Sequence, residues 1–257
     1  MAVSTPLTPN AEIVIAPTAP GRSRGQRRLR YLQKAIESSY ETALQTIVCG
    51  GLTIELLRVA DVDTLLDRLP KVQFRPDERL PYWADLWPSS LALAQYLWQA
   101  VGLEGLEVIE LGTGLGLAGI VASRKGGVVT FTDYEADALA FTRYNAYRNG
   151  CPRVIIRHLD WHAPTLDQTY AVIIASDVLY ERANFNPLRR LLDRALAPNG
   201  HFILAEPNRP IARDFFRLLR DHGFQYTRAT ERVEVGGEMA EVSIYHGGRK
   251  QASPNHS

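Results

Sequence analysis

The chain has 257 residues, of which 46% are hydrophobic and 22% charged, a composition that excludes a wholly disordered or fibrous protein. A formal net charge of +1 provides no overall basic surface for DNA or an anionic membrane, and two cysteines do not suggest a disulfide framework or a zinc site. The sequence contains neither an apolar run of about 18 residues nor a secretory signal pattern. We therefore expect a globular, cytoplasmic monomer without a resident metal.

Four segments are predicted along the chain. Residues 1–30 carry prolines followed by arginines, which predicts a flexible basic arm, and residues 248–257 predict a polar tail. Residues 31–80 predict a small accessory α/β layer before the main domain at 81–247. This layer is expected to contain a helix, a hairpin around two glycines, and a short helix, at residues 31–40, 42–48 with 52–59, and 61–69.

The main domain follows a first helix, predicted at 89–101, and alternates short β-rich segments with longer helical ones, a pattern typical of α/β folds. Strands are predicted at residues 106–111, 128–132, 154–158, 171–175, 201–205, 224–227 and 240–246. Helices are predicted up to 124 and at residues 136–148, 187–196 and 211–222. The last two strands are joined too tightly for a parallel crossover, so one must run antiparallel. We predict a Rossmann-like, seven-stranded, mostly parallel sheet with one antiparallel strand, flanked by helices. It lacks the second βαβαβ half of a dinucleotide dehydrogenase.

A glycine-rich turn, GTGLG at residues 112–116, follows the first strand of the sheet. Its spacing is neither the GxGxxG of dinucleotide-binding domains nor that of a phosphate-binding loop, which needs a following Lys and Ser or Thr. Asp133 ends the second strand, where a carboxylate can accept hydrogen bonds from both hydroxyls of a ribose. Each feature also has a structural interpretation, as a tight turn and as a helix cap.

The third strand is followed by Asp160 and Trp161, an acceptor for an amino group beside an aromatic face for a purine. The glycine turn, the ribose acid and this pair follow successive strands in order. Together they favour an adenosine ligand without a pyrophosphate, a description that S-adenosylmethionine fits. Taken alone, Trp161 fits equally well as a residue that packs at a rim.

These motifs resemble those of the class I, seven-β-strand S-adenosylmethionine methyltransferases. The resemblance is strongest to the protein lysine methyltransferase group that includes the enzymes acting on valosin-containing protein, calmodulin and the electron transfer flavoprotein β subunit. It covers about residues 81–246 and rests on the sequences around 87–94, 110–116, 133–134, 160–161 and 177–180. Motifs and resemblance together imply cofactor contacts from Trp87, Gly112, Thr113, Gly114, Gly116, Asp133, Asp160, Trp161 and Ser176. Residues 1–80 match only loosely, and this layer usually helps to shape the acceptor side.

The resemblance also implies a protein substrate that presents a lysine. An ammonium has no lone pair, so the amine must be neutral to accept a methyl group; the ordinary lysine pKa of about 10.4 is lowered in a desolvated channel. Asp177 and Tyr180 follow the fourth strand and are predicted as catalytic residues that orient the amine. Structurally, Asp177 also fits as a turn cap and Tyr180 as a packing residue.

Two other functions stay open. One is a class I methyltransferase acting on a small molecule or on RNA; the arginines of residues 22–30 are the only feature that favours RNA. The other is a non-catalytic S-adenosylmethionine-binding partner protein. The sequence at 176–180 differs from the Asn/Asp-Pro-Pro-Tyr element of enzymes that methylate adenine, cytosine or glutamine, which disfavours those substrates. The sequence also lacks the G-x-S-x-G motif of serine hydrolases.

Overall fold

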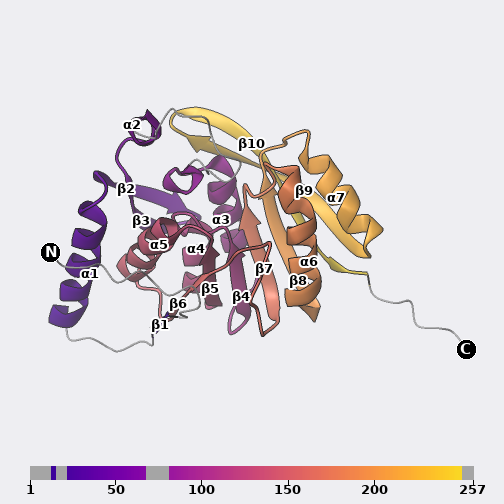
Figure 1. The fold of residues 1–257 in the computed structure, drawn as a ribbon, viewed down its shortest axis with the longest axis horizontal. Helices are drawn as coiled ribbons and strands as arrows, with labels where there is room; N and C mark the ends of the chain where they lie inside the picture. The colour runs from indigo at the N-terminus through magenta and orange to yellow at the C-terminus, as the bar shows by residue number, and fades with distance from the viewer. Residues whose placement is uncertain (1–12, 16–21, 68–80, 251–257) are drawn as a thin grey trace, which may run out of the picture.

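The computed structural model describes residues 13–15, 22–67 and 81–250 and shows one large sheet with helices on both faces (Figure 1). Parts of the predicted basic arm and polar tail, together with the end of the helix predicted at 61–69, lie outside the described residues.

Eight strands form the main sheet, in the order β1-β6-β5-β4-β7-β8-β10-β9. Their bounds are Ile13–Ile15 (β1), Glu107–Leu111 (β4), Val128–Asp133 (β5), Val154–His158 (β6), Tyr170–Ser176 (β7), Leu196–Glu206 (β8), Phe224–Val235 (β9) and Glu238–Arg249 (β10). The central strands β6, β5, β4, β7 and β8 are parallel, and β10 is antiparallel to both β8 and β9. Seven strands thus confirm the predicted Rossmann-like sheet.

The eighth strand, β1, corrects the prediction of a wholly flexible arm. Its three residues are Ile, Val and Ile, which favour β-structure, and they pair antiparallel with β6 in the register Ile13 opposite Ile156. The arginine-rich end of the predicted arm is also ordered, because helix α1 (Arg22–Glu37) begins well before the helix predicted at 31–40. Arg, Gln and Leu are good helix formers, and Arg28 stacks over the ring of Tyr147 at 4.7 Å.

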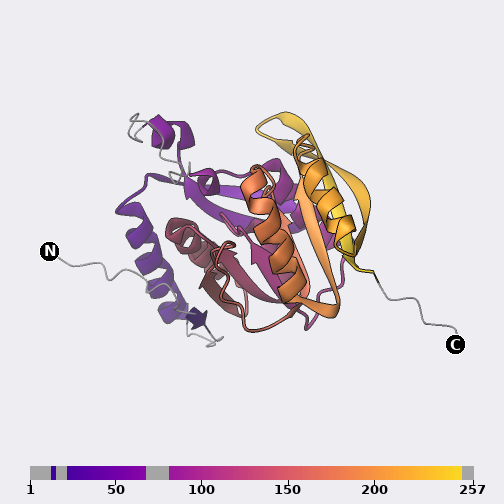
Figure 2. The same cartoon turned by 45° about the vertical axis from the view of Figure 1, so that its right-hand side comes forward.

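Helices cover the two faces of the sheet in separate groups (Figure 2). One apolar cluster joins the sheet to α3 (Pro88–Ala100), α4 (Leu117–Arg124) and α5 (Ala136–Arg148), and the other joins it to α6 (Phe185–Ala195) and α7 (Ala212–Asp221). Successive side chains of a strand point to opposite faces of the sheet, so each strand contributes to both clusters. On β4, Val108 packs in the first cluster and Ile109 in the second. None of the helices in the described part of the chain is long and apolar enough to cross a membrane.

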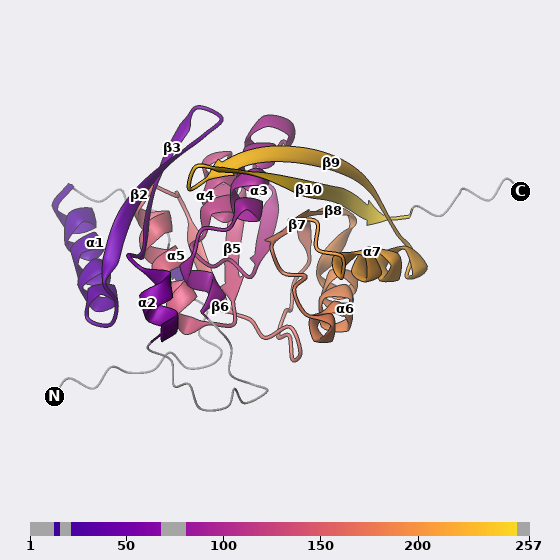
Figure 3. The ribbon, with the colours of Figure 1, turned by 90° about the horizontal axis from the view of Figure 1, so that it is seen from above.

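The accessory layer contains α1, the hairpin β2–β3 and the short helix α2 (Val62–Asp67), and it lies on the α5 side of the molecule (Figure 3). The predicted hairpin is confirmed as β2 (Thr42–Cys49) paired antiparallel with β3 (Leu52–Val59). Gly50 and Gly51 close it with φ of 57° and 91°, the left-handed values that a two-residue hairpin turn requires.

The final hairpin is much longer than predicted. Strands β9 and β10 pair along their whole lengths around Gly236 and Gly237, and β10 continues to Arg249, so the polar tail begins later than residue 248. Two short 3-10 helices, η1 (Tyr82–Ala84) and η2 (Arg182–Asn184), complete the described structure.

Candidate active site

A cleft of about 280 Å³ lies where β4, β5, β6, β7 and β8 end. The carboxyl edge of an open α/β sheet is the usual ligand site of such folds. The structure brings all eleven predicted site residues to this cleft: Trp87, Gly112, Thr113, Gly114, Gly116, Asp133, Asp160, Trp161, Ser176, Asp177 and Tyr180. Sequence reasoning missed several other lining residues, of which Tyr82, Trp83 and Arg209 matter most below.

Residues 112–116, here called the glycine loop, adopt a backbone that only glycine takes easily. Gly112, Gly114 and Gly116 have φ of 65°, 53° and 85°. A Cβ on Gly112 would lie 3.2 Å from Val178 and 3.4 Å from the Trp161 ring, so a side chain there would crowd the wall of the cleft. The glycines therefore allow both the turn and the close approach of the indole.

Asp133 is buried at the end of β5 and organises the neighbouring backbone. Its Oδ2 accepts the N–H of Gly114 at 3.0 Å, and its Oδ1 accepts the N–H of Glu135 at 3.0 Å. Burial raises the pKa of this carboxyl, and the backbone hydrogen bonds oppose that rise. The backbone N–H of Tyr134 also acts on this carboxyl, and because a carboxylate has about four acceptor positions, one remains for a ribose hydroxyl.

Asp160 and Trp161 lie at the next strand end. Asp160 Oδ1 accepts the N–H of His162 at 2.8 Å, which fixes the turn after β6. The indole nitrogen of Trp161 is buried and has no hydrogen-bond partner among the described residues. A buried indole N–H ordinarily finds an acceptor, so this donor beside the glycine loop suits a ligand.

Residues 81–87, here called the strap, border the cleft on a second side. Trp87 donates its indole N–H to the carbonyl of Tyr82 at 2.7 Å, and Tyr82 lies against Trp87 and Tyr180 with ring centroids 6.1 and 5.6 Å apart. Backbone atoms of Trp83 lie so close to Gly114 that a Cβ there would be 3.4 Å from the Trp83 carbonyl oxygen. The strap therefore contributes three aromatic residues to the cleft, two of them missed because no motif marks them.

Asp177 follows β7 with a φ of 61°, one of two left-handed non-glycine residues in the described chain. Its Oδ1 forms an ion pair with Arg209, and its buried Oδ2 has no hydrogen-bond partner among the described residues. Backbone strain of this kind concentrates at functional sites. Buried carboxylate oxygens normally accept a hydrogen bond, so this oxygen is available to accept one from a ligand.

Arg209 also contacts Glu206, 3.4 Å away at the end of β8. Burial raises the pKa of the Glu206 carboxyl, while the backbone N–H and the guanidinium of Arg209 oppose that rise. Arg209 thus joins two buried carboxylates. The sequence signal for it was weak, because the arginine is separated from Asp177 by a strand and a helix.

Glu110 lies under the glycine loop and is fully buried in β4. It accepts the hydroxyl of Thr113 at 2.5 Å and the N–H of Gly119 at 3.1 Å. Burial raises the pKa of this carboxyl to about 7, against the opposing effect of those two hydrogen bonds. Sequence analysis placed Glu110 in the motif without assigning it a role.

The cleft fits S-adenosylmethionine better than a phosphate-bearing cofactor. Its lining includes five carboxylates, from Asp85, Asp133, Glu135, Asp160 and Asp177. Within the described part of the chain, Arg209 is the only lysine or arginine in that lining, and it is already engaged by two carboxylates. Such a surface repels phosphate and attracts a sulfonium or an ammonium. The described residues include no cluster of three His, Cys, Asp or Glu side chains suited to a metal ion.

Comparison with known proteins agrees with this geometry. A family model described as lysine methyltransferase matches residues 71–222. The mouse protein named EEF1A lysine methyltransferase 3 is 32% identical over 186 residues, which cover 68% of this chain and 76% of the relative. Mouse protein N-lysine methyltransferase METTL21A is 33% identical over 144 residues; these cover 52% of this chain and 65% of the relative, just under two thirds of its length.

Among solved structures, magnesium protoporphyrin IX methyltransferase (ChlM) from Synechocystis PCC 6803 with bound SAM is similar in fold. The TM-score is 0.51 at 20% identity, over 63% of this chain and 78% of that chain. At this identity the likeness concerns the fold, and it agrees with the predicted Rossmann-like sheet.

Proposed function

Because the chain belongs to the lysine methyltransferase family, we propose that its cleft performs S-adenosylmethionine-dependent methylation of a lysine side chain on a protein, with separate halves for cofactor and acceptor. The cofactor half consists of the glycine loop, Asp133, Asp160, Trp161 and Ser176. The acceptor half consists of Tyr82, Asp177, Tyr180 and Arg209, and Trp87, predicted as a cofactor contact, lies against Tyr82 of this half.

In the cofactor half, Asp133 has an acceptor position for a ribose hydroxyl, and Asp160 with Trp161 has an acceptor and a ring for adenine. The glycine loop leaves space for the ligand beside Trp161. When bound, S-adenosylmethionine supplies the methyl group as an electrophile. The carboxylate-rich lining favours its positive sulfonium.

The observation that carries the acceptor assignment is the buried Oδ2 of Asp177, which has no partner among the described residues, in a cleft whose lining includes the rings of Tyr82, Trp87 and Tyr180. That oxygen can accept an N–H of the lysine amine and orient its lone pair. Packing of the lysine side chain against Tyr82, Trp87 and Tyr180 would remove water from the amine, which lowers its pKa toward the neutral form. The rings also attract the ammonium as it enters, through cation–π interaction. Arg209 holds the other oxygen and so fixes the rotamer of Asp177.

The direct test is to incubate the purified chain with labelled S-adenosylmethionine and a lysate of its own host, and to locate the label by mass spectrometry. We expect label on a lysine of one or a few proteins. Label on histidine, arginine, RNA or a small metabolite would refute the lysine assignment and leave the methyltransferase activity standing.

We further propose that the protein acts as a monomer in the cytoplasm, without a DNA or RNA partner. Support comes from the net charge of +1 and from two free cysteines, one of them buried. Light scattering and cell fractionation test the two parts of this proposal separately.

A further inference from the structure

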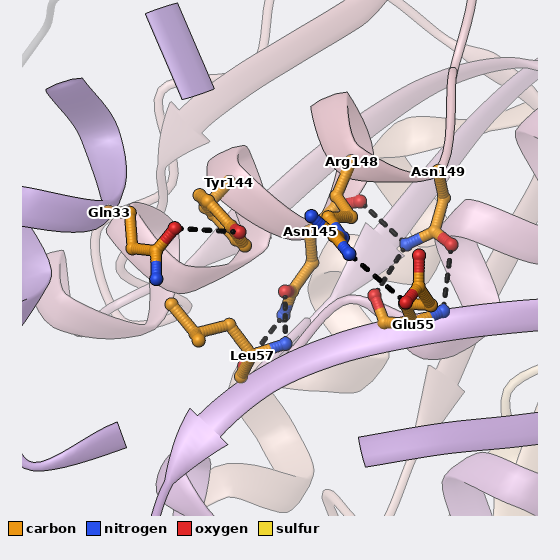
Figure 4. Close-up of polar contacts among 7 residues, drawn as sticks. All are labelled: Gln33, Glu55, Leu57, Tyr144, Asn145, Arg148 and Asn149. Atoms are coloured by element: carbon orange, nitrogen blue, oxygen red, sulfur yellow. Dashed lines mark hydrogen bonds and ion pairs between the residues drawn. The ribbon is translucent and has the colours of Figure 1, made fainter. Parts of the chain in front are cut away.

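The outer edge of β3 is hydrogen-bonded by side chains where a sheet would place another strand (Figure 4). Asn149, the C-cap residue of α5, accepts the N–H of Glu55 at 2.9 Å and donates to the Glu55 carbonyl at 2.8 Å. Asn145 likewise accepts the N–H of Leu57 at 2.7 Å and donates to the Leu57 carbonyl at 3.1 Å. A side-chain amide carries both a donor and an acceptor, so each asparagine takes the place of a peptide group.

The spacings on the two elements match. Four residues of a helix rise about 6 Å and two residues of a strand span about 6.7 Å, so asparagines at i and i+4 meet strand residues at j and j−2. The hairpin is therefore attached to α5 by two equivalent amide bridges.

The two asparagines differ in the second N–H of the amide. Asn149 Nδ2 donates it to the carbonyl of Asn145, within α5, at 2.8 Å. Asn145 Nδ2 donates it to the carbonyl of Leu115, in the glycine loop, at 3.0 Å. Asn145 is fully buried, at 0% exposure. Only Asn145 therefore joins the accessory hairpin directly to the glycine loop.

The bond to Leu115 is the second of two that α5 makes to consecutive carbonyls of the loop. Thr142 donates its hydroxyl to the carbonyl of Gly114 at 2.7 Å. Because a peptide group is planar, holding a carbonyl also fixes the direction of the next N–H. Asn145 and Thr142 thereby set two adjacent peptide planes beside Gly114, whose own N–H binds Asp133.

We propose that Asn145 is a positioning residue that couples the hairpin β2–β3 to the cofactor half of the cleft. An ordered hairpin then strengthens cofactor binding, and bound cofactor stabilises the hairpin to the same extent, because coupling between two equilibria is reciprocal. This gives the accessory layer a role in cofactor affinity in addition to any role in acceptor choice. The inference rests on the cofactor role of the glycine loop and is independent of the acceptor.

Asn145→Ala and Asn149→Ala form a matched pair, since each removes one bridge to β3 and only the first also frees the Leu115 carbonyl. Calorimetry with S-adenosylhomocysteine and thermal unfolding measure both variants. We expect similar losses of thermal stability, but about tenfold weaker binding for Asn145→Ala and a change within about twofold for Asn149→Ala. Equal loss of affinity in both variants, or in neither, would overturn the role of Asn145 as the residue that couples the hairpin to the cofactor half.

Hydrogen exchange on the wild-type chain tests the reciprocal effect and does not depend on either variant folding. Saturating S-adenosylhomocysteine should slow exchange in residues 52–59 more than in α7, which does not line the cleft. No slowing, or equal slowing in α7, would overturn the inference. Failure of the wild type to bind S-adenosylhomocysteine at all would instead refute the cofactor assignment itself. Methyl transfer is not measured, so the outcome does not depend on the lysine proposal.

Discussion

In the cofactor half of the cleft, carboxylate oxygens are already held by backbone N–H groups, as at Asp133, whereas in the acceptor half one oxygen of Asp177 has no partner among the described residues. The first arrangement orients the carboxylate before a ligand arrives and leaves it able to accept a ribose hydroxyl, which favours tight binding. The second leaves Oδ2 of Asp177 to accept a hydrogen bond from the reacting amine. Changes in the cofactor half should therefore alter affinity, and changes in the acceptor half should alter turnover.

The largest effect is expected for Asp177→Asn. Asparagine keeps the size of the side chain and tolerates the left-handed φ of 61°, whereas alanine would add strain. The variant places a donor where the amine needs an acceptor, so kcat should fall by about 100-fold or more. Binding of S-adenosylhomocysteine should change less than about twofold.

Asp193→Asn is a suitable control for that variant. Asp193 is also a carboxylate paired with arginines, Arg189 and Arg249, but it does not line the cleft. If the kcat of Asp177→Asn lies within threefold of that of this control, the claim that changes in the acceptor half alter turnover would be contradicted.

Asp133→Ala should have the next largest effect, on the opposite half. Loss of the carboxylate removes the acceptor for the ribose and frees the N–H of Gly114, so S-adenosylhomocysteine binding should weaken by about 1–3 kcal/mol. At saturating cofactor, kcat should be largely retained. Calorimetry measures the first and single-turnover kinetics the second. Unchanged affinity in a folded variant would reduce Asp133 to a helix cap.

Tyr180→Phe should give a smaller loss, about tenfold in kcat, because it deletes one hydroxyl and keeps the ring against Tyr82. Tyr226→Phe, which deletes a phenol outside the cleft, serves as the control. Steady-state kinetics on a methylatable lysine peptide compare the two. A kcat equal to the wild type would show that the Tyr180 phenol only packs.

The smallest effect concerns pH and Glu110, beneath the cofactor half. Its pKa is raised from 4.5 to about 7, so the folded state holds a proton that the unfolded state releases between those values. This contribution to stability is fully present below about pH 4.5 and is lost as the pH rises through 7. From about pH 6 to 8 the wild type should lose about 1 kcal/mol of unfolding free energy relative to Glu110→Gln. Denaturant unfolding of both proteins measures this difference, and parallel pH profiles would contradict it.

Local patterns were enough to predict most of the fold. Helix α5 and strand β6 have the predicted bounds, because apolar periodicity and flanking polar or glycine residues mark their ends. The outer part of β9 was missed, since residues 228–235 are mostly exposed, half of them are charged, and they form a strand through pairing with β10. The local signal for this hairpin was the Gly-Gly pair at 236–237, which is typical of a two-residue turn and was not used in the prediction.

The candidate site divides in the same way. Residues directly after a strand, such as Asp133 and Asp177, could be predicted to meet at one edge of the sheet. Arg209 and Trp83 line the cleft but do not follow a strand directly. Asn145 is buried in a helix, and no sequence motif marks it. Their importance lies in what they contact, which only the packed structure supplies.

The charged outer part of β9 also affects how copies of the chain behave when concentrated. Among the described residues β9 is the last strand on its side of the sheet, so one row of its backbone groups has no neighbouring strand. Arg228, Glu231, Arg232 and Glu234 lie along this strand, and Arg232 faces Glu241 across the hairpin at 3.6 Å. A second sheet edge could dock there only by desolvating these charges, at a cost that the added hydrogen bonds would not offset. The long hairpin thus protects the open end of the sheet against edge-to-edge aggregation.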